Sequence, residues 1–297
     1  MSAPPESALT PRRAAAAAWR VRAGLALLPV LLGAGALTPL LAAHAGSTPA
    51  GQVAAALKDA DRRAADAETE AARLQALPAP PVGIDQLRRQ RQQEAAAYRL
   101  RAAVRDEQQA VFQAATDPSL EAAVARQLPP SEQPGLAAAA SGLRSLWSLA
   151  GITDLSLVHA RFSHPYRAAQ PVASLSAFYR RAGAAYGVDW GVLAAINYIE
   201  SDFGRTPGPS SAGALGPMQF LPSTWAAFGQ GDIQDPADSI MAAARYLHHN
   251  GAPRDYQTAI LAYNHDQDYV DAVRSFAAAL AAEPHWLTRL YYWSTYG

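Results

Sequence analysis

The chain has 297 residues, half of them hydrophobic, with 25 basic and 25 acidic side chains and no cysteine. This length supports one fully packed domain with a smaller appendage. Because the net charge is zero, no basic field is available for a phosphate backbone, and we expect no nucleic-acid partner. The lack of cysteine excludes disulfides, thiol nucleophiles, cysteine zinc sites and a cysteine-linked lipid anchor.

Residues 1–45 have the pattern of an export signal or signal anchor. Arginines at positions 12, 13, 20 and 22 precede an apolar run over residues 23–43. The run ends in Ala43, His44 and Ala45, a spacing of small residues that favours cleavage after Ala45. It is also long enough to span a bilayer, in which case the arginines stay in the cytoplasm. Both alternatives predict that the remaining chain is exported, either secreted or anchored in the cell envelope.

Residues 46–128 are predicted to form an α-helical hairpin that acts as a spacer or docking element. Three prolines between residues 78 and 81 separate a helix over 52–77 from a second helix over 84–115. The two helices are expected to pair with each other as a coiled coil or to bind another protein chain. The first carries small apolar residues at alternating spacings of four and three, namely Val53, Leu57, Ala60, Ala64, Ala67, Ala71 and Leu74.

Residues 129–150 are predicted to be a linker with a short helix, and 151–297 a globular domain. Helical patterns cover residues 174–186, 190–203, 224–228, 237–250, 257–263 and 269–280, with Gly187, Gly204 and Gly251 at expected helix ends. Only residues 158–162 suggest a strand. The fold class is therefore predicted to be mostly α.

Glu200 is the residue that most needs a chemical explanation. Leu193, Ile196 and Glu200 follow each other at i, i+3 and i+7, which places the carboxyl group on the apolar side of a helix. Desolvation there raises the pKa of a carboxyl group, so that it stays protonated near neutral pH as a general acid must. The alternative is a structural glutamate paired with an arginine or a backbone amide.

Two further segments have the composition of a sugar site. Residues 210–225 place Gln219, which both donates and accepts hydrogen bonds, in a glycine- and proline-rich loop. Residues 259–270 combine Tyr263 and Tyr269 with Asn264, and such aromatic rings stack on pyranose faces while the amide bonds to hydroxyl groups. Each segment taken alone also fits an ordinary turn or helix cap.

Three motifs in this order and spacing resemble the soluble lytic transglycosylases, which cleave bacterial peptidoglycan. They are ESDFG at residues 200–204, AGALGPMQFLPSTW at 212–225 and AYN at 262–264. The chain is most similar to the exported actinobacterial enzymes, relatives of the membrane-bound type B enzymes, over residues 172–280. The resemblance implies a lysozyme-like catalytic domain with Glu200 as its single acid/base. It further implies that Ser201, Ser210, Gln219, Tyr263, Asn264 and Tyr269 bind the glycan.

The family's reaction cleaves the β-1,4 bond after N-acetylmuramic acid and leaves a 1,6-anhydro end. We expect no cofactor, and no metal because the calcium-loop motif of some relatives is absent from the sequence. Two alternatives stay open. A lysozyme-like hydrolase requires a second carboxylate, for which Asp202, Asp232 and Asp235 are candidates. A non-catalytic scaffold of the envelope would bind glycan or partner proteins through the hairpin.

Overall fold

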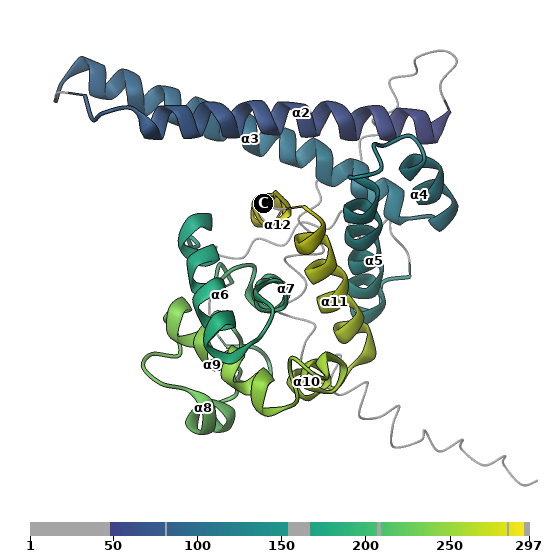
Figure 1. Ribbon diagram of the computed structural model, residues 1–297, viewed down its shortest axis with the longest axis vertical. Helices are drawn as coiled ribbons and strands as arrows, with labels where there is room; N and C mark the ends of the chain where they lie inside the picture. The colour runs from purple at the N-terminus through teal and green to yellow at the C-terminus, as the bar shows by residue number, and fades with distance from the viewer. Residues whose placement is uncertain (1–47, 81, 154–166, 207–208, 284, 294–297) are drawn as a thin grey trace, which may run out of the picture. The chain divides into compact units, whose positions relative to one another are not determined.

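The computed structural model describes residues 48–80, 82–153, 167–206, 209–283 and 285–293. Within these ranges the chain forms eleven helices and no strand (Figure 1), which confirms the mostly α class. The predicted export signal and the predicted strand at 158–162 fall outside the described residues. None of the described helices combines the length and apolar character needed to cross a membrane.

The described residues divide into two compact units. The globular unit comprises residues 145–153 and 167–274, and the hairpin unit comprises 48–144 and 275–293 within the described ranges. The sequence pattern assigned everything after residue 150 to one globular domain. In the structure, however, the residues after 274 group with the hairpin.

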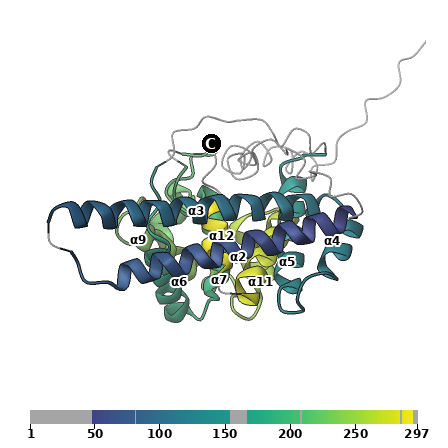
Figure 2. The same ribbon diagram turned by 90° about the horizontal axis from the view of Figure 1, so that it is seen from above.

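The hairpin unit is built on two long neighbouring helices, α2 (Pro49–Ala76) and α3 (Ile84–Ala115), which lie side by side in Figure 2. Thr48 caps α2 by accepting a hydrogen bond from the backbone N–H of Gly51 at 3.1 Å. Because alanine side chains are small, the two backbones approach closely along a largely alanine seam. The buried seam residues of α2 include Val53, Leu57, Ala60, Ala64, Ala67 and Leu74.

Three shorter helices complete this part of the fold: α4 (Pro118–Ala125), α5 (Gln133–Leu149) and α12 (Trp286–Trp293). The predicted linker is therefore mostly a 17-residue helix, α5, with a buried apolar side. Pro134 lies in its first turn, where a missing N–H costs nothing. The Pro-Gly signal thus marks a helix start, and the short helix expected within residues 129–150 has 17 residues. Both α5 and α11 (Gln267–Ala282) contribute residues to each unit.

A buried arginine joins α12 to the two long helices. The guanidinium group of Arg289 contacts Asp61 at 2.9 Å, Glu68 at 2.8 Å and Glu107 at 2.7 Å. Burial raises the pKa of Glu107 to about 8, although the positive charge of Arg289 acts in the opposite direction. Glu107 interrupts the apolar pattern of α3 because it faces this arginine.

The globular unit is arranged around α7 (Trp190–Ser201), ten of whose twelve residues are buried. Helices α6 (Val172–Tyr186) and α9 (Pro236–His249) pack on α7 and on each other. Figure 1 also labels the remaining helices of the unit, α8 (Pro222–Phe228), α10 (Tyr256–Tyr263) and the first part of α11. The helix that carries Glu200 is therefore the most enclosed one in this unit.

Helix α7 ends at Ser201, earlier than the glycine pattern predicts. Asp202 and Phe203 adopt left-handed φ values of 52° and 57°, and their N–H groups bond to the carbonyl oxygens of Tyr198 and Asn197. This arrangement closes the helix before Gly204 is reached. Gly187, in contrast, caps α6 in the left-handed conformation as expected, with φ of 65°.

Candidate active site

Glu200 lies in the last turn of α7 and receives a hydrogen bond from a buried phenol. The hydroxyl group of Tyr269, on α11, donates to Glu200 Oε1 at 2.6 Å. Burial raises the pKa of Glu200 to about 7, and the bond from Tyr269 opposes that rise because it stabilises the charged form. The carboxyl group therefore exists in both protonation states near neutral pH, as a group that first donates and then accepts a proton requires.

The end of α7 is attached to the glycine-rich loop by buried side chains. Asn197 donates from Nδ2 to the carbonyl oxygen of Pro217 at 2.8 Å, while its own Oδ1 accepts from the hydroxyl group of Tyr179 at 2.7 Å. The Ser201 hydroxyl donates to the same Pro217 oxygen and accepts from the N–H of Gly204 at 2.9 Å. These bonds fix the loop relative to Asn197, three residues before Glu200, and to Ser201, the residue that follows it.

The loop itself is a tight turn closed by a pair of backbone hydrogen bonds. Leu215 and Phe220 exchange N–H···O bonds of 2.8 and 2.9 Å. Gln219 occupies the left-handed region with φ of 49°, and its Nε2 donates to the Gly216 carbonyl at 2.9 Å. Because Nε2 is bonded within the turn, Oε1 is the atom of the Gln219 side chain that remains to accept a hydrogen bond. Gln219 is partly exposed.

Ser210 closes the beginning of the same loop. Its hydroxyl oxygen accepts from the backbone N–H groups of Ala212 at 3.2 Å and Ala214 at 3.1 Å. The side chain is partly exposed. Ser210 therefore both shapes the loop and keeps surface that a ligand can reach.

Tyr263, at the end of α10, connects the loop with the surroundings of Glu200. Its hydroxyl group donates to the carbonyl oxygen of Met218 at 2.6 Å, and its ring packs against Phe220 and Tyr246 with centroids 5.8 and 5.5 Å away. Burial, followed by the negative charge of Glu200, raises the pKa of Tyr263 well above its usual range. The charge of Glu200 therefore affects the pKa of Tyr263.

Asn264 caps α10 and is itself buried. Its side-chain oxygen Oδ1 is buried and has no hydrogen-bond partner among the described residues. A buried amide oxygen without a partner costs free energy, so such an atom is suited to accept a bond from a bound ligand.

The structure therefore divides the predicted site residues into two groups. Tyr263, Ser210 and Gln219 keep accessible surface, and the buried Asn264 joins them because its Oδ1 has no partner among the described residues. Ser201 and Tyr269 are fully buried, and their hydroxyl groups bond to Pro217 and Glu200. We therefore assign these two residues to holding the loop and the carboxyl group in place.

The three candidates for a second carboxylate all have structural partners of their own. Asp202 is buried and pairs with Arg205 at 3.0 Å. Asp232 accepts from the N–H of Gln234 at 2.8 Å, and Asp235 caps the N-terminus of α9. Each of these side chains has a local role that accounts for its presence.

Sequence reasoning missed Asn197 and Tyr179. The available signal was an amide residue three positions before Glu200, within an otherwise apolar helix. Tyr179 gave no such signal, because its contact with Asn197 joins two different helices.

The Transglycosylase SLT domain family matches residues 178–280, a segment that contains every candidate site residue. Residues 178–280 form an SLT domain. The hairpin precedes this SLT domain in the chain and lies outside the match.

Two curated relatives have similar names. The chain is 30% identical over 127 residues to a membrane-bound lytic murein transglycosylase F of Thiobacillus denitrificans, an alignment that covers 40% of this chain and 27% of that protein. It is 30% identical over 118 residues to the protein of the same name in Stutzerimonas stutzeri, covering 37% and 24%. The chain thus spans about a quarter of the length of these relatives. No solved structure gave a significant match.

The loop of the SLT domain depends on glycine at position 216. This residue has φ of +75°, and a Cβ atom there would lie 1.9 Å from the carbonyl oxygen of Ile233. We expect Gly216→Ala to lower the thermal unfolding midpoint strongly, corresponding to about 2–4 kcal/mol. Gly213→Ala is the matched control, because Gly213 has φ of +79° but no atom within 4 Å of an added Cβ. Equal losses in the two variants would show that the contact with Ile233 is not the cause.

Proposed function

We propose that this protein is a peptidoglycan lytic transglycosylase that cleaves the β-1,4 bond between N-acetylmuramic acid and N-acetylglucosamine. The observation that carries the proposal is Glu200, a carboxyl group with a pKa of about 7 that is held by a buried tyrosine within an SLT domain. The names of the two relatives support the same substrate and reaction.

In the proposed mechanism Glu200 acts twice. Protonated Glu200 first gives its proton to the glycosidic oxygen as the bond to C1 of N-acetylmuramic acid breaks. The resulting carboxylate then removes the proton of the C6 hydroxyl of that sugar, whose oxygen attacks C1 and forms the 1,6-anhydro ring. Because the nucleophile belongs to the substrate, the step gains from a high effective molarity and requires no second carboxylate. The local roles of Asp202, Asp232 and Asp235 are consistent with this route.

We assign sugar binding to Ser210, Gln219, Tyr263 and Asn264. The partly exposed ring of Tyr263 offers an apolar face for a pyranose. The unpaired Oδ1 of Asn264 is suited to accept from an N-acetyl N–H. Ser201 and Tyr269 act through their neighbours, as positioning residues.

Asn264→Ala should therefore raise KM for glycan fragments, whereas Ser201→Ala should lower the stability of the protein. Equal KM values for Asn264→Ala and the unaltered protein would refute the assignment of Asn264 to sugar binding.

Tyr269→Phe is expected to change the pH profile of the reaction. The tyrosine bond lowers the pKa of Glu200, so its removal should raise that pKa above 7. The alkaline limb of kcat/KM, which reports loss of the proton from the free enzyme, should then move to higher pH while the rate falls about tenfold. An unchanged limb with an equal loss of rate at every pH would assign Tyr269 a purely structural role.

We further propose that the chain acts in the cell envelope. The relatives are named membrane-bound proteins, and the first 45 residues of this chain have the composition of a cleaved signal or a retained anchor. The N-terminal sequence of the exported protein distinguishes these two forms, because cleavage leaves a chain that begins at residue 46.

The hairpin is proposed to bind a partner protein. Its turn and the beginning of α3 carry four of the exposed large apolar side chains in the described part of the chain, Leu77, Val82, Ile84 and Leu87, with Val82 95% exposed. Exposed apolar groups gathered in this way are typical of interaction sites. Pull-down from envelope extracts should lose a specific partner on Val82→Asp together with Ile84→Asp, and retention of the same partners would refute this role.

The activity is tested by the mass of the products. Incubation with purified peptidoglycan should release muropeptides with 1,6-anhydro ends, which are lighter than hydrolysed ends by one water. Reducing ends would instead identify a lysozyme-like hydrolase. Binding to peptidoglycan without any release would favour a non-catalytic scaffold.

A further inference from the structure

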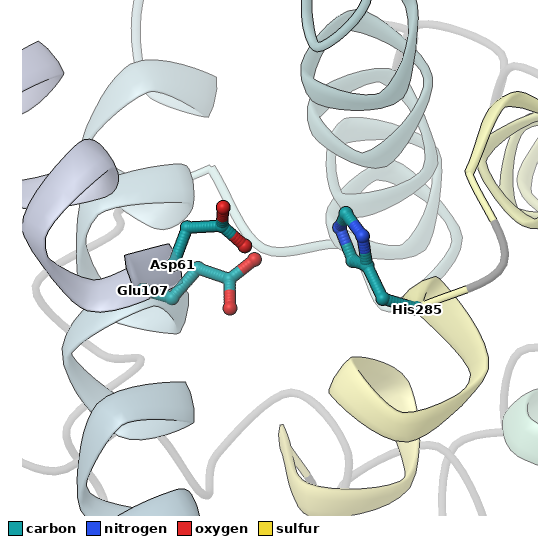
Figure 3. Close-up of side chains that lie close together, drawn as sticks. All are labelled: Asp61, Glu107 and His285. Atoms are coloured by element: carbon teal, nitrogen blue, oxygen red, sulfur yellow. The ribbon is translucent and has the colours of Figure 1, made fainter. Parts of the chain in front are cut away.

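A small cavity in the hairpin unit is surrounded by groups that bind metals. The cavity has a volume of about 40 Å³ and is lined by five largely apolar side chains together with His285 and four carboxylates, Asp61, Glu107, Glu132 and Glu283. Figure 3 shows the carboxyl groups of Asp61 and Glu107 beside each other, with the imidazole of His285 facing them across a gap. We propose that Asp61, Glu107 and His285 bind a first-row divalent cation, with Zn²⁺ as the best fit.

The three side chains provide a suitable set of ligand atoms. One oxygen of Asp61, one of Glu107 and one ring nitrogen of His285 all lie within 4.8 Å of one another. Tetrahedral zinc, with bonds of about 2.0–2.2 Å, needs its donor atoms roughly 3.5 Å apart. The three donor atoms would therefore have to approach one another by about 1 Å when the ion binds. The side chains of Asp61 and His285 are 39% and 27% exposed, so neither is fully enclosed, and Asp61 already contacts Arg289 at 2.9 Å through one of its two oxygens. A mixed nitrogen and oxygen set favours zinc over the all-oxygen cations calcium and magnesium.

The balance of charge around the cavity favours a cation. Five carboxylates, those of the four lining residues and of Glu68, face one arginine, Arg289, and the neighbouring Lys58. Arg289 approaches one oxygen each of Asp61, Glu68 and Glu107, which leaves the second oxygen of Asp61 and Glu107 as a donor atom. A dication compensates the remaining negative charge, which is otherwise costly to bury.

Two details of the surroundings support a built site. Glu107 is only 4% exposed, and because its Oε2 forms the ion pair with Arg289 Nε at 2.7 Å, Oε1 is the oxygen that remains for a cation. Glu283 Oε2 lies 3.7 Å from His285 Nδ1. This distance is longer than a hydrogen bond, but a carboxylate on the side of one ring nitrogen favours the other nitrogen as the metal ligand.

The proposed ion links α2, α3 and the turn that precedes α12. These elements are far apart in the sequence, so the ion would stabilise the hairpin unit by joining them. The site lies outside the SLT domain and uses none of the groups assigned to catalysis. It is also unrelated to the calcium loop whose absence led us to expect no metal.

The test is zinc binding by the full chain after removal of metals with a chelator. Titration calorimetry should detect one site, and the thermal unfolding midpoint should rise with Zn²⁺ and return to its starting value on chelation. His285→Ala should weaken this site by roughly a hundredfold or more, and Glu283→Gln by about tenfold. His249→Ala is the matched control, because His249 is an exposed histidine on α9 in the other unit and should leave the affinity unchanged.

Three results would overturn the proposal. The first is that the metal-free chain does not bind Zn²⁺. The second is that His285→Ala leaves the affinity for Zn²⁺ unchanged. The third is that Ca²⁺ raises the thermal unfolding midpoint as much as Zn²⁺ does, both in the unaltered protein and in His285→Ala. Circular dichroism of His285→Ala distinguishes loss of the ligand from loss of the fold, and Glu283→Gln, which keeps all three ligands, provides a second measurement in a folded chain.

Discussion

Replacing Glu200 with glutamine should reduce the release of anhydro-muropeptides from purified peptidoglycan by about a thousandfold or more. General acid and base catalysis each contribute about 10²–10⁴ in rate, and in the proposed mechanism both pass through this one side chain. Glutamine keeps the size of the side chain and can still contact Tyr269. The loss of activity would therefore be caused by the absence of the carboxyl proton and not by a change of shape. Glu121→Gln, which alters a glutamate of α4 paired with Arg144, is the control and should retain activity.

The same substitution should also change stability in a pH-dependent way. The pKa of Glu200 is about 7 in the folded protein against 4.5 for an unperturbed glutamate, so the folded state binds more protons between these values. Stability of the unaltered protein should fall as pH rises from about 4.5 to 7 and then level off. Glu200→Gln removes this fall and should be more stable than the parent by about 3 kcal/mol at pH 8. Normal turnover by the variant would refute the assignment, whereas a folded and inactive protein would support it.

Replacing Arg289 with methionine should destabilise the hairpin unit by about 3–5 kcal/mol. The substitution retains the apolar stem but leaves Asp61, Glu68 and Glu107 without their shared positive partner, and an uncompensated buried carboxylate is costly. Hydrogen exchange over residues 49–115 and 286–293 should become faster. Because the chain has two compact units, exchange in these segments is more informative than a single unfolding curve.

Arg73→Met is the matched control for Arg289→Met. Arg73 pairs with Glu70 on the surface of α2, where its side chain is 58% exposed, and solvent-exposed pairs of this kind contribute little to stability. The defect of Arg289→Met should also shrink at acid pH, because protonation removes the unpaired negative charges. Equal losses in both variants, or a loss that does not depend on pH, would contradict the role assigned to the buried cluster.

The parts of the fold that were predictable are those set by neighbouring residues. The prolines at positions 78, 80 and 81 predicted where α2 ends and α3 begins, and the alanine seam of α2 is buried as its spacing indicated. The position of Glu200 on the apolar side of α7 was also readable, since three residues of one helix were enough to define that side. Composition alone does not separate a linker from a helix start, since Pro134 and Gly135 lie in the first turn of α5, the helix within residues 129–150.

Local patterns in this chain were sufficient for its mostly α class, for the helix that carries Glu200, and for the loop and the aromatic segment around it. Contacts between distant residues decided the rest. The bond from Tyr269 to Glu200 spans 69 positions, and the contact of Arg289 with Asp61 spans 228. Periodicity describes one helix at a time, whereas the pKa of Glu200 and the pairing of Arg289 depend on side chains supplied by other helices once they are packed.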